Sequence, residues 1–402
     1  MKRACLAALL AALCLLLAGC GGQEIESSLF VLSMAVDPAA DGNLTVTVKA
    51  LSGTKETDAA AGASSGSATG AADAQGGENP GAGLESPEPG YIVLSATAKS
   101  CLRALGLLSA TTPRTVNLSQ LREIVLSRTL AESGAALDIL KEIRAMYRAN
   151  GEAVVVVTPD DAGDFIRRQR AILGVRLSQY LEVLFEHFSQ MDTIPPDATL
   201  EKVIRAMESD TYDALAVYAA GNRFDSPLLL PGAAETDRLP GHLPRTAPAQ
   251  NEYMGSALFS GSVMTGVLTG EETGLFCLLT GRAQRRISFI GGAQYKTNLP
   301  TRVNQAIDRQ SGALSVGVDM HLTRIAGGED VPSAAIAADI ERGLISLMQK
   351  LQAASCDAAG FGRIAVRAAT DLAAWADMDW AARYESAPVR AAVRVDVLQN
   401  GL

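Results

Sequence analysis

The chain has few of the residues that build metal centres. Its 402 residues include only three histidines, which are His187, His242 and His321. None of them belongs to an H-x-x-x-H or H-E-x-x-H pattern, which would place two metal ligands on one face of a helix. Each histidine is isolated in the sequence, and His187 and His321 are expected to be ordinary surface residues. The sequence therefore predicts no metal site.

Cysteine is also too sparse for a disulfide framework. Two of the six cysteines lie in an apolar N-terminal run, and Cys20 follows that run closely. The three that remain, Cys101, Cys277 and Cys356, are far apart and form no C-x-x-C pair. A secreted disulfide framework needs an even and denser set. We therefore expect these three residues to be buried free thiols that pack as small apolar side chains.

Basic and aromatic residues are scarce as well. The 35 Lys and Arg residues are outnumbered by 44 Asp and Glu residues, which gives a formal net charge of -9. Nucleic-acid binding requires a basic footprint, so the composition argues against nucleic acid as a partner. Aromatic residues make up 5% of the chain and hydrophobic residues 48%. Aliphatic side chains are therefore expected to form the core.

No catalytic or cofactor-binding pattern lies in a context that supports it. There is no phosphate loop with G-K-[ST], and no dinucleotide-binding glycine pattern follows a predicted strand. Residues 62–66 match the G-x-S-x-G nucleophile pattern, but no strand precedes them, so the match is interpreted as chance. Glu271 and Glu272 are adjacent in a predicted helix, where neighbouring side chains do not face each other. The sequence predicts neither an enzyme nor a cofactor.

The first 20 residues have the organisation of an export signal. A basic start precedes an uncharged apolar run, residues 4–17, and the stretch Leu17-Ala18-Gly19-Cys20 follows. This is the pattern of a bacterial lipoprotein signal. It predicts a signal peptide over residues 1–19, a diacylglyceryl thioether on Cys20, and a mature chain anchored by lipid to the outer face of a membrane. A transmembrane anchor is the less favoured alternative because the run is short. A cleaved soluble secretory signal would not need the cysteine.

Composition divides the remaining chain into segments. Residues 20–28 form a polar membrane-proximal spacer, and residues 29–221 form an N-terminal domain. Within that domain, residues 53–89 contain almost no large apolar side chain. Burial cannot offset the ordering entropy of such a segment, which predicts a disordered insertion. Residues 222–251 are rich in Pro, Gly and polar residues and predict a linker. Residues 252–402 form a C-terminal domain.

Hydrophobic periodicity predicts a mixture of strands and helices. The predicted strands cover residues 29–36, 44–50, 117–126 (with a mixed interpretation open), 154–157, 214–219, 257–268 around a tight turn, 314–322 and 389–397. The predicted helices cover residues 91–108, 139–147, 161–173, 179–188, 200–208, 269–279 and 333–351, and one more helix after residue 362 carries Leu372, Trp375 and Met378. Thr269 and Glu272 have the spacing of a capping box. The irregular order predicts an α+β fold with two to three mixed strand-helix subdomains and no repeating βαβ unit.

Two stretches of the second half resemble a known family. Residues 265–275 resemble the G-x-L-x-x-E-E-T-x-G stretch of the Ger(x)C family, the lipoprotein C subunits of spore germinant receptors. Residues 356–362 resemble the D-x-x-G-F-G stretch of the same family, and a helix with two tryptophans and a Val-rich strand follow, as in the family. The residues that carry the resemblance are Gly270, Glu271, Glu272, Gly274, Gly360, Phe361 and Gly362. The first half has a similar plan, although the insertion at 53–89 is extra.

The resemblance implies a fold of three mixed α/β subdomains and a non-catalytic subunit that acts in spore germination. It implies contact with two membrane-embedded partners, the A and B subunits of the receptor, on the outer face of the spore inner membrane. Recognition of the germinant is assigned to the B subunit in this family, so no ligand-binding residue is expected in this chain. An alternative is a solute-binding lipoprotein of a transporter, a class that usually has two lobes of repeating βαβ units. A lipid-anchored hydrolase would need a nucleophile-base set or a metal cluster.

Overall fold

The computed structural model describes residues 27–52, 90–146, 148–171, 176–222, 239–243, 251–283, 287–290, 293–326 and 331–398. The predicted signal peptide, Cys20 and the predicted insertion at 53–89 lie outside these residues. Most of the predicted linker at 222–251 lies outside them too.

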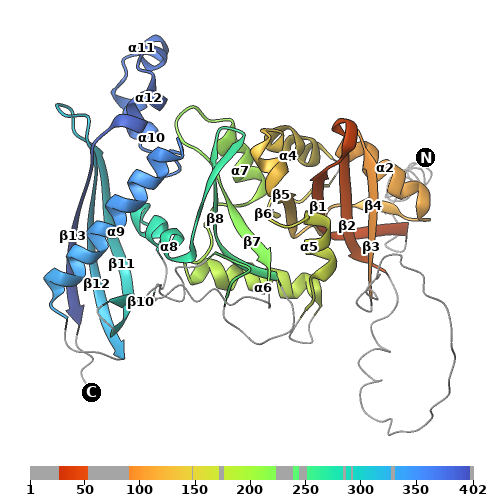
Figure 1. Cartoon of the computed structure of the whole chain (residues 1–402), viewed down its shortest axis with the longest axis horizontal. Coiled ribbons are helices and arrows are strands. Elements are labelled where there is room, and N and C mark those ends of the chain that lie inside the picture. The colour runs from red at the N-terminus through yellow and green to blue at the C-terminus, as the bar shows by residue number, and fades with distance from the viewer. Residues whose placement is uncertain are drawn as a thin grey trace, which may run out of the picture.

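A large mixed sheet forms the first part of the molecule (Figure 1). Its strands are β1 (Ser28–Pro38), β2 (Leu44–Leu51), β3 (Tyr91–Ala98), β4 (Thr115–Asn117), β5 (Glu123–Ser127), β6 (Val154–Thr158), β7 (Leu215–Gly221), β8 (Asn251–Ser260) and β9 (Val263–Leu268). The order is β3-β2-β1-β5-β6-β7-β8-β9, and β4 pairs with the start of β1. The central strands β1, β5, β6 and β7 are parallel neighbours, whereas the flanking pairs are antiparallel.

Helices cover both faces of this sheet. The helices are α2 (Cys101–Thr111), α3 (Arg128–Glu132), α4 (Ala136–Ala145), α5 (Ala162–Arg168), α6 (Leu177–Gln190) and α7 (Leu200–Met207), and a short 3-10 turn, η2 (Ala40–Gly42), joins β1 to β2. One core contains residues of α2, α3, α4 and α7, and the other contains residues of α5 and α6. Strand β6 contributes to both cores, because successive side chains of a strand point to opposite faces of the sheet. Val155 and Val157 belong to the first core and Val156 to the second. The prediction of a strand buried on both faces is confirmed.

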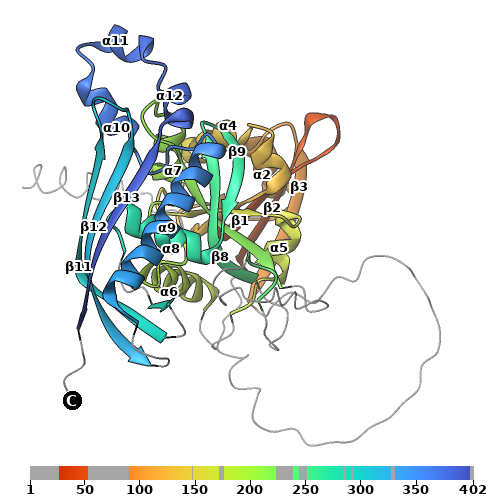
Figure 2. The ribbon, with the colours of Figure 1, turned by 60° about the vertical axis from the view of Figure 1, so that its left-hand side comes forward.

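A second, smaller sheet lies at the other end of the molecule (Figures 1 and 2). It has the order β10-β11-β12-β13, formed by β10 (Ile287–Ile290), β11 (Ala293–Ile307), β12 (Leu314–Ala326) and β13 (Val389–Leu398). Helix α9 (Ser333–Ala353) packs on this sheet, and α8 (Gly270–Leu279) lies between α9 and the large sheet. Four short segments separate α9 from β13: α10 (Gly362–Ala365), η3 (Val366–Ala368), α11 (Leu372–Asp377) and α12 (Trp380–Ser386).

This mixture of helices with two sheets confirms the α+β prediction. The division into domains at residues 222–251 stays a prediction. Strands β8 and β9 follow the predicted linker, yet they pair with β7 and complete the large sheet. The chain therefore leaves this sheet only at Leu268, where α8 follows almost at once.

Several predicted elements differ from the structure. The predicted helix over residues 91–108 is wrong in its first half, because Tyr91–Ala98 form β3, paired along its length with β2. The β-branched and aromatic residues at its start favour a strand, and the helix begins only after Ser100, whose side chain accepts a hydrogen bond from the N–H of Arg103. The predicted helix over 161–173 ends at Arg168 because Gln169 has an extended backbone.

Three further differences concern interrupted or missed elements. The predicted strand over 117–126 is divided into β4 and β5. The predicted helix after residue 362 is broken into α10, η3, α11 and α12. Strands β10 and β11 were not predicted, because the alternation along β11 is weak and a register shift interrupts its pairing with β12.

Candidate functional site

Two aspartates join the large sheet to the C-terminal part of the chain. Asp213 precedes β7 and Asp357 follows α9. The N–H of Asp357 donates a hydrogen bond to the Asp213 carboxylate at 2.8 Å, and the N–H of Asp213 donates to the carbonyl of Asp357 at 3.3 Å. The Asp213 carboxylate also accepts a bond of 2.9 Å from the N–H of Gly261, in the turn between β8 and β9. Three segments far apart in sequence are thereby held together.

The Asp357 side chain organises the turn that follows it. Its carboxylate accepts hydrogen bonds from the N–H groups of Phe361 at 2.9 Å and Gly362 at 2.7 Å, and from Nε1 of Trp380 at 3.0 Å. Gly360 has a φ of +77°, which favours glycine. Burial raises the pKa of Asp357 to about 7 in spite of these donors, and the neighbouring Asp213 adds to the rise. The stretch that resembles D-x-x-G-F-G is thus a tight, buried turn around one carboxyl group.

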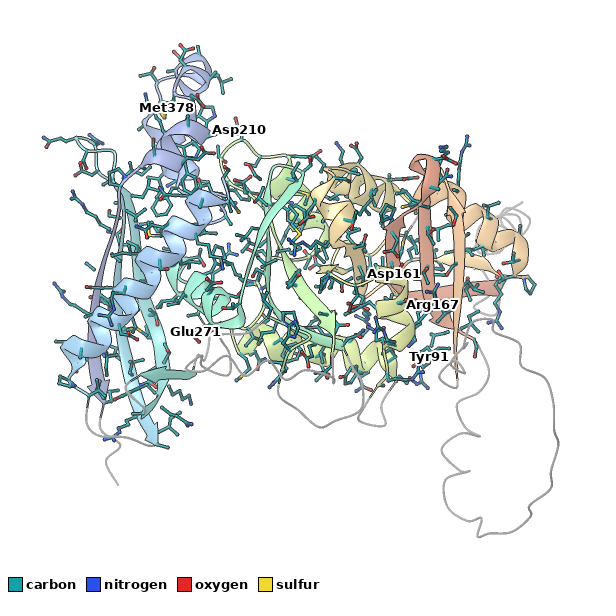
Figure 3. The ribbon with its side chains drawn as sticks, viewed as in Figure 1. Tyr91, Asp161, Arg167, Asp210, Glu271 and Met378 are labelled. Atoms are coloured by element: carbon teal, nitrogen blue, oxygen red, sulfur yellow. The ribbon has the colours of Figure 1, made fainter. Side chains whose placement is uncertain are left out.

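The helical segment beyond this turn makes a second contact with the first part. Nε1 of Trp375 donates a hydrogen bond of 2.9 Å to Asp210, 165 residues earlier in the chain. Figure 3 shows Asp210 beside the α11–α12 region, on the loop before β7. The rings of Trp375 and Trp380 stack with centroids 6.3 Å apart. Both tryptophans therefore help to fix the junction through their indole N–H groups.

The other family-like stretch forms the start of α8. Thr269 and Glu272 make the predicted capping box: the Thr269 hydroxyl accepts from the N–H of Glu272, and the Glu272 carboxylate accepts from the N–H of Thr269. This prediction is confirmed. Glu272 also accepts bonds of 2.6 and 2.7 Å from Nζ of Lys350 on α9. Gly270 and Gly274 are buried in the packing of α8, while Glu271 is half-buried on the same helix (Figure 3). These residues do not meet those of the Asp357 turn at a common reactive centre.

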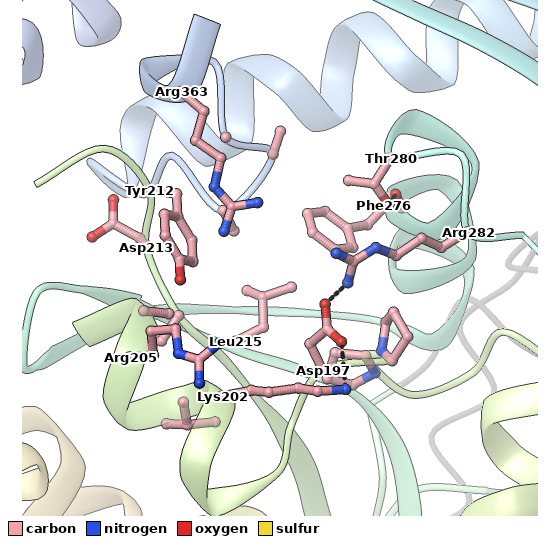
Figure 4. Close-up of a pocket in the computed structure, with 18 of the residues that line it drawn as sticks. Asp197, Lys202, Arg205, Tyr212, Asp213, Leu215, Phe276, Thr280, Arg282 and Arg363 are labelled. Carbon is pink, nitrogen blue, oxygen red and sulfur yellow. Dashed lines mark hydrogen bonds and ion pairs between the residues drawn. The ribbon is translucent and has the colours of Figure 1, made fainter. Parts of the chain in front are cut away.

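A pocket of about 480 Å³ lies beside the Asp213–Asp357 junction (Figure 4). Its walls come from the segment around α7, the start of β7, the end of α8, β11 and the turn after Asp357. Among the lining residues are Pro195, Asp197, Lys202, Arg205, Tyr212, Leu215, Phe276, Thr280, Arg282, Gln305, Arg363 and Arg367. The pocket thus draws on both sheets and on the connections between them.

Cations predominate in the pocket. Lys202, Arg205, Arg282, Arg363 and Arg367 line it together with two carboxylates, Asp197 and Asp213. Asp197 forms ion pairs with Arg282 and with Lys202, the latter at 3.0 Å. Figure 4 shows the guanidinium groups of Arg205, Arg282 and Arg363 around the open space.

Two of these guanidinium groups are held in place by neighbouring side chains, that of Arg363 by Tyr212 and that of Arg282 by Asp197. The Arg363 guanidinium lies 3.5 Å from the centre of the Tyr212 ring, a cation-π contact that orients it. Burial, and secondly the charge of Arg363, lower the pKa of Arg282. The second cause shows that the positive charges of Arg282 and Arg363 lie close enough to repel each other. Among the described residues, the ion pair of Arg205 is a long contact of 3.7 Å with Glu201.

The guanidinium groups of this site can donate hydrogen bonds to an anion. Guanidinium groups stay protonated and cannot act as general bases at neutral pH. Among the described residues, no group of three or more His, Cys, Asp and Glu could hold a metal ion.

Cys101, Cys277 and Cys356 are free and buried, as predicted, and burial raises the pKa of each thiol. No described helix is long and apolar enough to cross a membrane.

The sequence did not indicate this pocket. Its cations come from α7, the segment after α8, α10 and η3, so no local motif brings them together. Each alone resembles a solvated surface residue. The sequence offered one related signal, the D-x-x-G-F-G resemblance, because that turn supplies one wall.

Comparison with known proteins gives a match over most of the chain. A family model described as "Spore germination protein N-terminal domain" matches residues 21–220, and one described as "Spore germination B3/ GerAC like, C-terminal" matches residues 254–401. No protein with a curated description matches. A solved structure described as "Crystal Structure of the GerBC protein" is similar with 12% identity and a TM-score of 0.49, covering 91% of this chain and 96% of that one.

Proposed function

Because the chain belongs to the GerAC-like spore germination family, we propose that it is a lipid-anchored, non-catalytic subunit of a spore germinant receptor. It acts by contact with the membrane-embedded A and B subunits, on the outer face of the spore inner membrane. The observation that carries the proposal is the order of the matches along the chain. The N-terminal family model begins at residue 21, directly after Cys20 of the lipoprotein signal, and the C-terminal model follows it.

The geometry supports contact in preference to catalysis. The two stretches that resemble the family build a capping box, a buried turn and a junction between sheets, all of which rigidify the molecule. A rigid body with two sheets fixed to each other can transmit a displacement from one partner to another. A solute-binding lipoprotein is the weaker alternative, since the family match does not favour it.

The lipid anchor also suggests how the molecule stands on the membrane. Ser28, where β1 begins, pairs with Thr115 of β4, which follows the end of α2 closely. The eight residues from Cys20 to Ser28 can span at most about 28 Å. Helix α2 therefore lies within reach of the bilayer. Its outer face carries Leu102 and Leu107, which are 62% and 52% exposed, and Arg103 between them suits an anionic surface.

A pull-down from detergent-solubilised spore membranes tests the receptor assignment. The tagged chain is expected to recover two multi-span partners, and a Cys20→Ala variant, which cannot be lipidated, is expected to recover much less of both. Recovery of the chain alone, from spores that germinate normally without it, would contradict the proposal and favour the solute-binding alternative.

A further inference from the structure

We propose that the pocket beside the Asp213–Asp357 junction binds a small organic anion that carries carboxylate or phosphate groups. The inference goes beyond the receptor assignment, which needs no ligand in this chain. It rests on the convergence of Arg205, Arg282 and Arg363 on one cavity (Figure 4).

Charge is the first argument. The whole chain has a formal net charge of -9, yet five cations and two carboxylates line this pocket. The Asp213 carboxylate is already occupied by two backbone N–H groups, and Asp197 is shared between Arg282 and Lys202. Among the described residues, no carboxylate lies within ion-pair distance of Arg363 or Arg367. An anion is the ligand that such a surplus of positive charge attracts.

Geometry is the second argument. A guanidinium group offers a planar fork of donors that matches a carboxylate or a phosphate, commonly with two parallel hydrogen bonds. The Tyr212 ring holds the Arg363 fork from one side at 3.5 Å. Arg282 is held by Asp197. Two of the three forks are therefore oriented before any ligand arrives, which reduces the entropy lost on binding.

Size and lining indicate a small molecule. A cavity of about 480 Å³ is in the range that holds compact organic ligands. Leu215, Phe276 and Tyr212 add apolar and aromatic surface between the cations. This combination fits an organic acid whose body packs on the side chains while its charged groups meet the arginines. A polyanion such as a nucleic acid would need an extended basic surface.

Calorimetry on the chain purified in detergent tests the proposal, with citrate and inorganic phosphate as probes at constant ionic strength. Citrate carries three carboxylates on a carbon frame, so it is expected to bind more tightly than phosphate alone. Arg363→Gln and Arg205→Gln are each expected to weaken citrate binding about tenfold or more, as the loss of a charge-assisted contact does. Arg363→Lys keeps the positive charge but lacks the planar pair of guanidinium donors, so this variant is expected to bind citrate with intermediate affinity.

Arg103→Gln is the matched control, because it makes the same change in net charge on α2, outside the pocket lining. It is expected to leave citrate binding within about twofold of the parent chain. Circular dichroism and thermal melting confirm that each variant is folded. No binding to the parent chain, or equal weakening by Arg103→Gln and Arg363→Gln, would overturn the proposal. Loss of partners in the pull-down would not affect this result, so failures of the two proposals are distinguishable.

Discussion

The carboxylate of Asp213 accepts a hydrogen bond of 2.8 Å from the backbone N–H of Asp357, 144 residues later in the chain. The reverse bond, from the Asp213 N–H to the Asp357 carbonyl, makes the contact reciprocal. Asp357 is buried and Asp213 half-buried, and each carboxylate accepts hydrogen bonds from further N–H groups of its surroundings. The contact between the large sheet and the C-terminal part of the molecule thus depends on two carboxylates, which accept hydrogen bonds from backbone N–H groups that these carboxylates satisfy.

Replacement of Asp213 is expected to weaken this junction. Asp213→Ala leaves the N–H groups of Gly261 and Asp357 without their acceptor, which costs about 3 kcal/mol in the free energy of unfolding. Urea denaturation measures it. The control is Asp319→Ala, since Asp319 is 58% exposed and only 3.9 Å from Arg394; it should change stability by less than about 0.5 kcal/mol. Equal effects from the two variants would show that the junction contributes nothing particular.

Asp357 is expected to make the stability depend on pH. Its pKa is about 7 in the folded chain against an ordinary value of 3.8, so the folded state binds the proton more tightly than the unfolded state. The resulting stabilisation is complete below pH 3.8 and is lost as pH rises to about 7, by at most about 4 kcal/mol. Burial raises the pKa of Asp213 in the same direction.

The Asp357→Asn variant isolates this contribution. An amide cannot release a proton, so the difference in unfolding free energy between variant and parent should change across pH 4 to 7 and be constant above it. The variant also loses one acceptor oxygen for Phe361 or Gly362, which lowers its stability at low pH. Denaturation at a series of pH values measures both effects. Parallel curves for the two proteins over the whole range would refute the prediction.

A side chain at Gly362 is expected to disrupt the same turn. A Cβ there would lie 2.5 Å from the carbonyl oxygen of Thr211 and 2.7 Å from Nε1 of Trp380. Because the first neighbour is backbone, Gly362→Ala should cost about 2 kcal/mol or more. Gly106→Ala is the matched control inside α2, where nothing lies within 4 Å of an added Cβ. It should raise stability by up to about 1 kcal/mol. Thermal melting distinguishes the two signs.

How far the sequence predicts this structure depends on whether the signal is local. The capping box of Thr269 and Glu272 was predictable because both partners lie within one turn of helix. The paired runs of β1 and β2 and the valine run of β6 were predictable for the same reason. The strand Tyr91–Ala98 is not predictable from its sequence, because its apolar residues fit a helix as well as an edge strand, and only pairing with β2 decides.

The candidate site depended on contacts that no local pattern reveals. Asp213 and Asp357 show no relation in the sequence, and neither do Tyr212 and Arg363. The resemblance at residues 356–362 identified the right turn without its partner on the other side of the junction. The charge composition gave no indication of a cationic pocket, because acidic residues are in excess over the whole chain. The five cations of the pocket come together only in the folded structure.

The start of α8 offers a separate test of local and tertiary stabilisation. Thr269→Ala removes the side-chain acceptor of the capping box and should lower the free energy of unfolding by about 1 kcal/mol, whereas Thr269→Ser should be nearly neutral.

Glu272→Gln keeps an acceptor for the N–H of Thr269 but removes the charge that pairs with Lys350. It should cost less than about 1 kcal/mol, and less still at high salt. Guanidinium denaturation and a salt series measure these differences. A Glu272→Gln effect independent of salt would contradict the role assigned to Lys350.

The proposed orientation on the membrane can be tested without partners. The mature chain from Cys20 is coupled through that thiol to a maleimide lipid in anionic vesicles that contain brominated acyl chains. Coupling is selective because the other three thiols are buried and have raised pKa values. Leu107→Trp on α2 should then be strongly quenched by the brominated lipid, since its side chain would enter the interface.

Leu372→Trp is the matched control for this measurement. Leu372 is 84% exposed, more than Leu107, but it lies on α11 at the opposite end of the molecule (Figure 1). Its emission should be quenched no more than that of the native Trp375 and Trp380, which contribute the same background to every variant. Equal quenching of the two introduced tryptophans would mean that the anchored chain has no preferred orientation. Stronger quenching at Leu372 would mean that the α11 end faces the bilayer, and α2 would then be free to meet a protein partner.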